Sequence, residues 1–247
     1  MPIFEAQNLH KRFGDQVVLE DISLSFEANR LAGIMGPNGA GKTTCFNVLT
    51  GRYKPDRGRV RFQGKDITGW PPRSIARLGI ARSFQTMSLF DEYTALENVL
   101  IAVPEVRALG FHGLRDLGAE SQSIDKASEV LRRVGLAGLE YKPASSLPYG
   151  QRRALEIAIA LAAEPKLLFL DEPTSGLGSD ATARLADLIR AIRQDLTIVV
   201  IEHDMRFLFG LADTISVIHW GQVIAQGTPE ELRANKWVQA SNLGALA

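Results

Sequence analysis

Residues 36–43 read Gly-Pro-Asn-Gly-Ala-Gly-Lys-Thr, a loop of the form Gly-x-x-x-x-Gly-Lys-Thr. The apolar run Leu31 to Met35 precedes this loop, and a helix-like stretch follows it. Glycines let the backbone turn tightly, so that several amide N–H groups point into one concavity, and the dipole of the following helix favours an anion there. The sequence therefore predicts a strand, a phosphate-binding loop and a helix in succession.

Two side chains of this loop have a predicted chemical role. Lys42 supplies a mobile cation for the β and γ phosphates of a nucleotide, and the hydroxyl of Thr43 is placed to bind Mg²⁺. We therefore expect nucleotide binding here and not an ordinary glycine turn. The expected nucleotide contacts are Gly36, Pro37, Asn38, Gly39, Ala40, Gly41, Lys42, Thr43 and Thr44.

A second group of candidates follows the apolar run Leu167 to Leu170, which ends in Asp171 and Glu172. A carboxylate at a strand end that faces a phosphate loop is suited to the Mg²⁺ shell, so Asp171 is a candidate metal ligand. Glu172 is a candidate for orienting or deprotonating an attacking water at the γ-phosphate. An ordinary solvated strand end is the alternative, which the phosphate loop in the same chain disfavours.

Composition indicates one sizeable core with a smaller lobe attached, since the chain has 247 residues, of which 45% are apolar. Lys plus Arg and Asp plus Glu both number 28, so no overall charge favours nucleic acid or an anionic membrane as a partner. Residues 1–82 carry 13 basic and 7 acidic side chains, a net of +6, which leaves −6 for the rest. Phosphate handling by the first part of the chain and a solvated basic face are alternative explanations of this excess of basic side chains.

The chain has a single cysteine, Cys45, which excludes an internal disulfide and fits a reducing compartment. Because Cys45 lies among apolar residues just past the phosphate loop, we interpret it as a small packing residue of a helix. The first residues lack a basic region followed by an apolar core, and no apolar run approaches the roughly 18 residues of a spanning helix. We expect the chain not to cross a membrane itself.

Periodicity predicts strands at both ends of the chain and helices between them. Antiparallel strands are expected at 3–9, 17–26 and 59–62, and buried parallel strands at 167–170, 197–201 and 214–218. A terminal strand is expected at 222–225. Helices are expected at 94–103, 128–134, 152–163 and 180–193, and a last one after Thr228.

Two of these helices have a predicted capping box, Thr94 to Glu97 and Thr228 to Glu231. Residues 104–123 are rich in glycine and turn-forming residues, and we expect an exposed loop or a short helix there.

Leu147-Pro-Tyr-Gly-Gln151 precedes the predicted helix 152–163 and so forms a second glycine-bearing helix start that is able to bind an anion. Taken with the phosphate loop, the Asp-Glu pair, Gln85 in Arg82-Ser-Phe-Gln, and His203 after Val199-Val-Ile-Glu, this pattern resembles the ATPase subunit of ABC transporters. The resemblance covers nearly the whole chain.

The resemblance implies an α/β P-loop NTPase fold, with an ABC ATPase core, an N-terminal antiparallel β subdomain and an inserted helical lobe. It implies one domain over 1–247, with residues 1–85 and 164–247 as the core and 86–163 as the lobe that carries the signature turn. ATP and Mg²⁺ are the implied ligands. Two copies dimerise head to tail in this family, so that the signature turn of one closes on the nucleotide held by the other.

Carried over position by position, the resemblance gives roles to particular residues. Gln85 would sense Mg²⁺ and water, His203 would contact the γ-phosphate, and Phe13 would stack on adenine, with strand packing as the alternative for Phe13. The implied catalytic set is Glu172, His203, Gln85 and Lys42, the metal set is Thr43, Gln85 and Asp171, and the signature contacts are Tyr149, Gly150 and Gln151. The remaining histidines, His10, His112 and His219, are interpreted as capping or surface groups.

The sequence departs from the family pattern at two positions. Pro148 replaces the usual serine of the signature turn and offers neither a hydroxyl nor an N–H group. Gly178 replaces the common aspartate of the loop after Glu172, which puts the usual communication between the two sites in doubt. A Pro-Tyr signature and the stretch 84–90 are nonetheless similar to branched-chain amino-acid uptake ATPases.

The expected function is therefore ATP hydrolysis in an ABC importer of branched-chain or other hydrophobic amino acids, at the cytoplasmic face of the inner membrane. The implied partners are a second ATPase copy or a paralogue, two membrane permease subunits and an extracytoplasmic substrate-binding protein, without nucleic acid. Urea, amides, aromatic acids or lipid are alternative cargoes. A soluble ABC-type ATPase of translation or DNA repair is an alternative of another class, as is a GTPase switch, although the chain lacks an Asn-Lys-x-Asp guanine reader.

Overall fold

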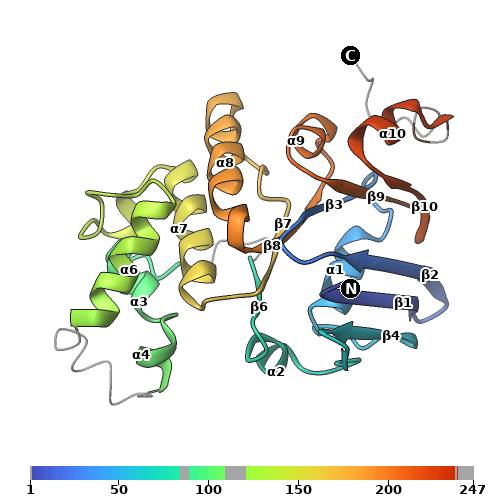
Figure 1. Cartoon of the computed structure of the whole chain (residues 1–247), viewed down its shortest axis with the longest axis horizontal. Helices are drawn as coiled ribbons and strands as arrows, with labels where there is room; N and C mark the ends of the chain where they lie inside the picture. The colour runs from blue at the N-terminus through green and yellow to red at the C-terminus, as the bar shows by residue number, and fades with distance from the viewer. Residues whose placement is uncertain (1, 84–88, 109–120, 237, 239–247) are drawn as a thin grey trace.

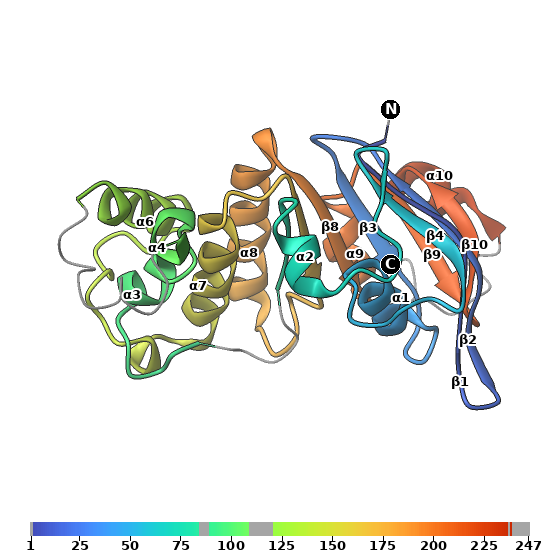
Figure 2. The same ribbon diagram turned by 90° about the horizontal axis from the view of Figure 1, so that it is seen from below.

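The computed structural model describes residues 2–83, 89–108, 121–236 and 238. Two sheets lie beside each other in one part of the molecule, and a group of helices forms the other part (Figure 1). Seen from below, the helices α3, α4 and α6 and the antiparallel sheet occupy opposite ends, with α8 and β8 between them (Figure 2). The expected α/β fold, with an antiparallel subdomain beside a mainly parallel core, is confirmed.

The antiparallel sheet has the strand order β2-β1-β4-β5. Its strands form because apolar residues alternate with polar ones, which buries one face: Phe4 and Ala6 of β1 are buried, whereas Gln7 is exposed. The predicted third strand, 59–62, begins two residues earlier than expected. The bounds are β1 Phe4–Phe13, β2 Gln16–Phe26, β4 Arg57–Phe62 and β5 Lys65–Asp66.

The second sheet has the order β10-β9-β3-β8-β7-β6, and its strands are parallel except for β10, which pairs with β9 in the antiparallel sense. The carboxyl ends of β3, β8 and β7 therefore meet at one edge. The bounds are β3 Leu31–Met35, β6 Ile80–Arg82, β7 Leu167–Asp171, β8 Thr197–Glu202, β9 Thr214–His219 and β10 Gln222–Gly227.

The central strands are apolar except at their ends because each of their faces is buried in a different core. Phe169 of β7 packs toward α1 and the antiparallel sheet, where its ring contacts Phe4 (centroids 5.5 Å apart), Phe26 and Phe46. Leu168 and its neighbours on the other face join the helical side of the molecule. Cys45 lies in the first core, where burial raises the pKa of its thiol to about 12, in agreement with a packing role.

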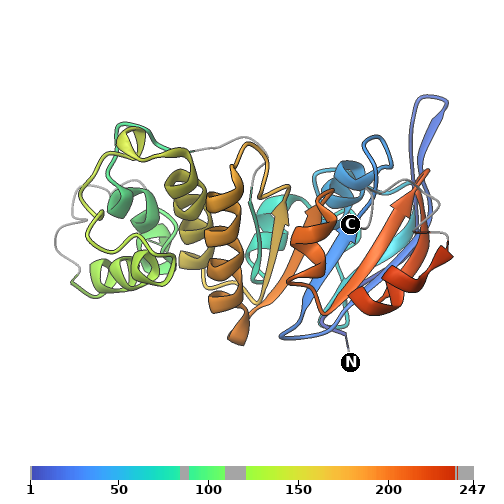
Figure 3. The same ribbon diagram turned by 90° about the horizontal axis from the view of Figure 1, so that it is seen from above.

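Helices pack on the second face of the parallel sheet, and separate helices form the lobe beside them. The helices α7 and α8 lie side by side between the lobe and the sheet (Figure 3). The described helices are α1 Lys42–Leu49, α2 Pro72–Ala76, α3 Ala95–Leu100, α4 Pro104–Ala108, α6 Ser121–Arg133, α7 Tyr149–Ala162, α8 Ser179–Ile192, α9 Met205–Phe209 and α10 Pro229–Ala234, with 3₁₀ turns at Ala144–Ser146 and Arg193–Asp195.

Both predicted capping boxes are present, at the starts of α3 and α10. In each box a threonine hydroxyl accepts a hydrogen bond from the N–H group of a glutamate three residues on, whose carboxylate in turn accepts one from the threonine N–H. The helix expected at 94–103 ends at Leu100, and the one expected at 152–163 begins at Tyr149. The interval 104–123 contains α4 and the start of α6, while its residues 109–120 lie outside the described part.

No helix in the described ranges is both long and apolar enough to cross a bilayer.

Candidate nucleotide-binding site

The predicted phosphate loop connects β3 to α1 and has the backbone that its glycines make possible. Gly41, the residue before α1, has a φ of 99°, a conformation that L side chains rarely adopt. A Cβ atom on Gly36 would lie 2.1 Å from the carbonyl oxygen of Ile218. The loop therefore packs so closely against β9 that no larger residue fits at position 36.

Lys42 is buried at the first position of α1, and its side chain turns back over the loop. Its ammonium group donates hydrogen bonds to the carbonyl oxygens of Gly36 at 2.8 Å and Pro37 at 3.0 Å. Burial lowers the pKa of Lys42, and the carboxylates of Glu172, Glu202 and Asp171 oppose that shift. The structure thus brings the predicted cation and the predicted acids into one electrostatic cluster.

Asp171 ends β7 and is only 3% exposed. Its N–H group donates to the hydroxyl oxygen of Ser83 at 3.2 Å, but its Oδ1 atom has no hydrogen-bond partner in the part of the chain that the structure describes. Burial, with the charge of Glu172 as the next cause, raises the pKa of Asp171 to about 6. A buried carboxylate oxygen that has no partner among the described residues is suited to bind a cation, and the exposed Thr43 would add a hydroxyl ligand.

Glu172 lies one residue beyond the strand in a left-handed backbone conformation, with a φ of 44°. Such a conformation costs a non-glycine residue on the order of 1 kcal/mol and is maintained only where the surroundings fix it. Here the N–H group of Glu172 donates to the carbonyl oxygen of Ile201 on β8 at 2.9 Å. The Nδ1 atom of His203 lies 3.8 Å from the Glu172 carboxylate, so the structure brings these two candidates together.

Glu202 belongs to the same cluster, although sequence analysis gave it no role. It is fully buried at the end of β8 and pairs in register with Met35, the residue before the phosphate loop. Its carboxylate accepts hydrogen bonds from the N–H group of Thr174 at 2.8 Å, the Thr174 hydroxyl at 2.5 Å and the N–H group of His203 at 3.1 Å. The only sequence signal was a charged residue that closes an otherwise apolar strand.

The predicted metal set of Thr43, Gln85 and Asp171 stays a prediction. Gln85, predicted both as catalytic and as a metal ligand, lies outside the described residues. Within the described ranges, no group of three or more His, Cys, Asp or Glu side chains is arranged to hold a metal ion. A cation at Asp171 would therefore need hydroxyl, phosphate or water oxygens to complete its shell.

The predicted signature residues Tyr149, Gly150 and Gln151 form the first turn of α7, directly after Pro148. Pro148 provides no side-chain cap to this turn. The N–H group of Gln151 donates to the carbonyl oxygen of Pro148 at 2.9 Å, which leaves the N–H groups of Tyr149 and Gly150 for an external acceptor. The start of α7 and the start of α1 belong to different parts of the molecule, with β7 and β8 between the two helices (Figures 1 and 2). The structure does not bring the two predicted anion-binding turns together within one chain.

Phe13 ends β1 and is 44% exposed, with its ring edge-on to Tyr53 at a centroid distance of 5.3 Å. The ammonium group of Lys11 lies 5.4 Å from the Phe13 ring centroid. Stacking of Phe13 on adenine stays a prediction, and the contact with Tyr53 agrees equally with the alternative of packing.

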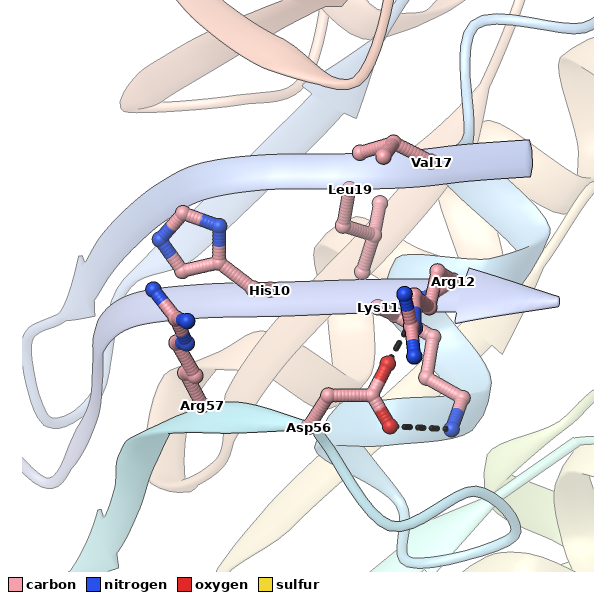
Figure 4. A pocket seen from close by; sticks show the side chains of 7 residues that line it. All are labelled: His10, Lys11, Arg12, Val17, Leu19, Asp56 and Arg57. Atoms are coloured by element: carbon pink, nitrogen blue, oxygen red, sulfur yellow. Dashed lines mark hydrogen bonds and ion pairs between the residues drawn. The ribbon is translucent and has the colours of Figure 1, made fainter. Parts of the chain in front are cut away.

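A hollow of about 350 Å³ lies beside β1, β2 and β4 (Figure 4). Asp56 in its wall accepts hydrogen bonds from the N–H group of Arg12 at 2.7 Å and from Lys11 at 3.1 Å, and these bonds lower the pKa of Asp56. His10 and Arg57 line the other end of the hollow. Part of the basic excess of residues 1–82 thus lies on the antiparallel sheet.

Comparison with known proteins gives a consistent result. The family model described as "ABC transporter" matches residues 19–175. The chain is 40% identical to the high-affinity branched-chain amino acid transport ATP-binding protein LivG of Salmonella typhimurium, with 98% of each chain covered. It is also 40% identical to the protein BraF of Pseudomonas aeruginosa, which bears the same description, again over 98% of each chain.

Solved structures show the same likeness in three dimensions. The ADP conformation of MJ1267, described as an ATP-binding cassette of an ABC transporter, superposes with a TM-score of 0.88 at 31% identity. The match covers 99% of both chains.

Proposed function

This chain belongs to the ABC transporter family, and from that premise we propose that it energises the uptake of branched-chain or other hydrophobic amino acids. That it is the ATP-binding, ATP-hydrolysing component of a transporter follows from the family. The proposed cargo is supported by the 40% identity to LivG and BraF over nearly whole chains and by the Pro-Tyr signature turn. Urea, amides, aromatic acids and lipid stay alternative cargoes.

One observation carries the proposed catalytic site: Lys42, Asp171, Glu172 and Glu202 interact electrostatically at the shared edge of β3, β7 and β8. In the proposal Lys42 leaves the carbonyl oxygens of its own loop to bind the β and γ phosphates, with backbone N–H groups around it. Glu172 accepts a proton from the attacking water, or orients that water, and His203 contacts the γ-phosphate. The residues mainly position charges around a phosphoryl group that transfers through a loose transition state.

Asp171 and Thr43 are the proposed Mg²⁺ ligands in the described chain, and Gln85 is proposed as a third. The metal would neutralise charge on the transferring phosphoryl group. Asp171 fits this position because its Oδ1 atom is buried without a hydrogen-bond partner among the described residues.

The separation of the two anion-binding turns supports a head-to-tail dimer. Because the start of α7 does not meet the loop before α1 in one chain, a second copy or a paralogue would supply Tyr149, Gly150 and Gln151 to close the site (Figure 2). ATP would then join the two protomers, and hydrolysis would release them. Pro148 offers no hydroxyl in this arrangement, so the Gly150 turn and the helix dipole would bind the γ-phosphate.

We propose a single ABC ATPase domain over residues 1–247, with a core of 1–85 and 164–247 and a lobe of 86–163. The lobe would transmit closure to two permease subunits, with the ATPase held peripherally at the cytoplasmic face of the inner membrane. An extracytoplasmic substrate-binding protein would deliver the cargo, and no nucleic acid takes part.

The proposal is tested by co-purifying the tagged chain with its neighbouring gene products and measuring which small molecule the capture protein binds. We expect hydrophobic membrane proteins in the complex, and uptake of labelled leucine that stops with Glu172→Gln. Recovery of ribosomes or DNA would favour the soluble ATPase instead. Binding of urea, an amide, an aromatic acid or lipid by the capture protein would keep the transporter and replace the cargo.

A further inference from the structure

We propose that the hydroxyl of Tyr149 holds the loop that carries Glu172 in position within the same protomer. This makes Tyr149 a positioning residue for hydrolysis, separate from any contact that its turn makes with a partner's nucleotide. The inference rests on the proposed function, in which Glu172 acts on the attacking water. The loop of residues 172–178 is called the Glu172 loop below.

The contact joins the first residue of α7 to the middle of the Glu172 loop. The Tyr149 hydroxyl donates a hydrogen bond to the carbonyl oxygen of Ser175 at 3.2 Å. Ser175 is in turn bound to the catalytic candidate, because its N–H group donates to the carbonyl oxygen of Glu172 at 3.1 Å. Two hydrogen bonds therefore lead from the start of α7 to the backbone of Glu172.

The fit around this hydrogen bond is close. Gly176 has a φ of 76°, and a Cβ atom there would lie 3.1 Å from the Tyr149 hydroxyl oxygen and 3.3 Å from its ring. On the neighbouring side, a Cβ atom on Gly150 would be 3.4 Å from the Cβ of Ala181, in α8. The Tyr149 ring thus packs against loop backbone that carries no side chain at position 176. A side chain at that position would displace the ring.

The same loop is held from the core by Glu202. The buried carboxylate of Glu202 binds both the N–H group and the hydroxyl of Thr174, the residue before Ser175. The Glu172 loop is therefore attached to β8, through Glu202 and the carbonyl oxygen of Ile201, and to α7, through Tyr149. Since α7 packs against α3 and α6 of the lobe, a shift of the lobe changes the Tyr149 attachment and leaves the Glu202 attachment in place.

This arrangement predicts a specific kinetic effect. The Tyr149 side chain is 43% exposed and its hydrogen bond joins two neutral groups, so losing the bond has a small effect on stability. The phosphate loop is not part of the contact, and removing the hydroxyl leaves the backbone of the signature turn that would face a partner's nucleotide, so we expect nucleotide affinity to stay unchanged. Loss of one such bond corresponds to about a 3- to 10-fold lower rate if it acts on the hydrolytic step.

The first test compares Tyr149→Phe with Tyr141→Phe, which makes the same chemical change at a tyrosine that is 78% exposed. For Tyr149→Phe we expect kcat for ATP to fall about 3- to 10-fold, with KM, nucleotide affinity and Tm unchanged. Tyr141→Phe should match the parent. An unchanged kcat, or a loss confined to KM, would overturn the inference.

The second test separates an effect within one protomer from an effect across the dimer. Mixed dimers are prepared from differently tagged chains, one of which carries Glu172→Gln, so that only the other chain keeps its glutamate. Tyr149→Phe should slow hydrolysis when it is in the chain with the intact Glu172, and not when it is in the Glu172→Gln chain. The reverse pattern would assign Tyr149 to the partner's nucleotide and overturn the inference.

Failure of the inference is distinguishable from failure of the proposed function. If the parent hydrolyses ATP and Glu172→Gln abolishes that activity, an inert Tyr149→Phe contradicts the inference alone. If Glu172→Gln hydrolyses ATP at the parental rate, the result contradicts both the inference and the proposed function.

Discussion

The ammonium group of Lys42 lies 2.8 Å from the carbonyl oxygen of Gly36, so the cation of the phosphate loop is bound by the loop itself. The carbonyl oxygen of Pro37 accepts a second hydrogen bond at 3.0 Å. Loop carbonyls therefore hold the lysine where a triphosphate would replace them as acceptors. Phosphate oxygens are the stronger acceptors because they are charged.

Lys42→Ala should weaken nucleotide binding by about 10- to 100-fold, since it removes charge-assisted hydrogen bonds to the phosphates. Isothermal titration with ATP in the presence of Mg²⁺ measures the change. Lys142→Ala, at an exposed lysine of the lobe, is the matched control and should bind like the parent. An unaltered titration of Lys42→Ala would contradict the predicted phosphate loop.

Glu172→Gln should retain ATP binding, accumulate a dimer with ATP and lower kcat by at least about 100-fold, the usual size of general-base catalysis. Light scattering after gel filtration measures the dimer, and phosphate release measures turnover. Parental hydrolysis by this variant would show that another group activates the water.

Asp171→Asn should stabilise the nucleotide-free protein at pH 7.5. The pKa of Asp171 is about 6 in the folded protein, above its ordinary value of 3.8, so the folded state binds this proton more tightly than the unfolded chain. The carboxyl therefore lowers the free energy of unfolding progressively as pH rises from about 4 to about 6. Above that range it lowers this free energy by its full amount, on the order of 3 kcal/mol.

Thermal melts without nucleotide or Mg²⁺ at pH 7.5 and pH 4 check this prediction. The Tm gain of Asp171→Asn should be large at pH 7.5 and small at pH 4, where the carboxyl is protonated in the folded parent and about 40% protonated in the unfolded chain. Asp195→Asn, at an exposed aspartate, should change neither melt. A gain of equal size at both pH values would rule out the buried charge as its cause.

Glu202→Gln should destabilise the protein by about 1–3 kcal/mol and reduce kcat. The amide has one oxygen in place of two, so its NH₂ group would face one of the donors from Thr174 or His203, which then loses its acceptor. Urea unfolding and ATPase assays measure the two effects. Glu230→Gln, on the exposed face of α10, is the control, and equal behaviour of the two variants would contradict the role given to Glu202.

Local chemistry made part of the fold predictable. The glycine pattern located the loop between β3 and α1, and the Thr94 and Thr228 capping boxes located two helix starts, because each of these signals acts over a few neighbouring residues. The start of α7 was predicted three residues late. Pro148 adopts the extended conformation of a cap, which places the helix-disfavouring Gly150 inside the first turn.

The contacts that sequence analysis missed are those between distant segments. Glu202 has no motif of its own, and it reaches the site only through the register of β8 beside β3. The hydrogen bond between Tyr149 and Ser175 spans 26 residues, and it needs the positive φ of Gly176. Such contacts depend on tertiary packing, which no local pattern encodes.

In the proposed mechanism, one nucleotide is enclosed between two protomers. The most direct test of this arrangement is a structure of the Glu172→Gln protein with Mg²⁺ and ATP. We expect the Tyr149 and Gly150 turn of one protomer to contact the γ-phosphate bound by Lys42 of the other. A triphosphate fully coordinated by a lone chain, with the start of α7 remote from every ligand, would contradict it.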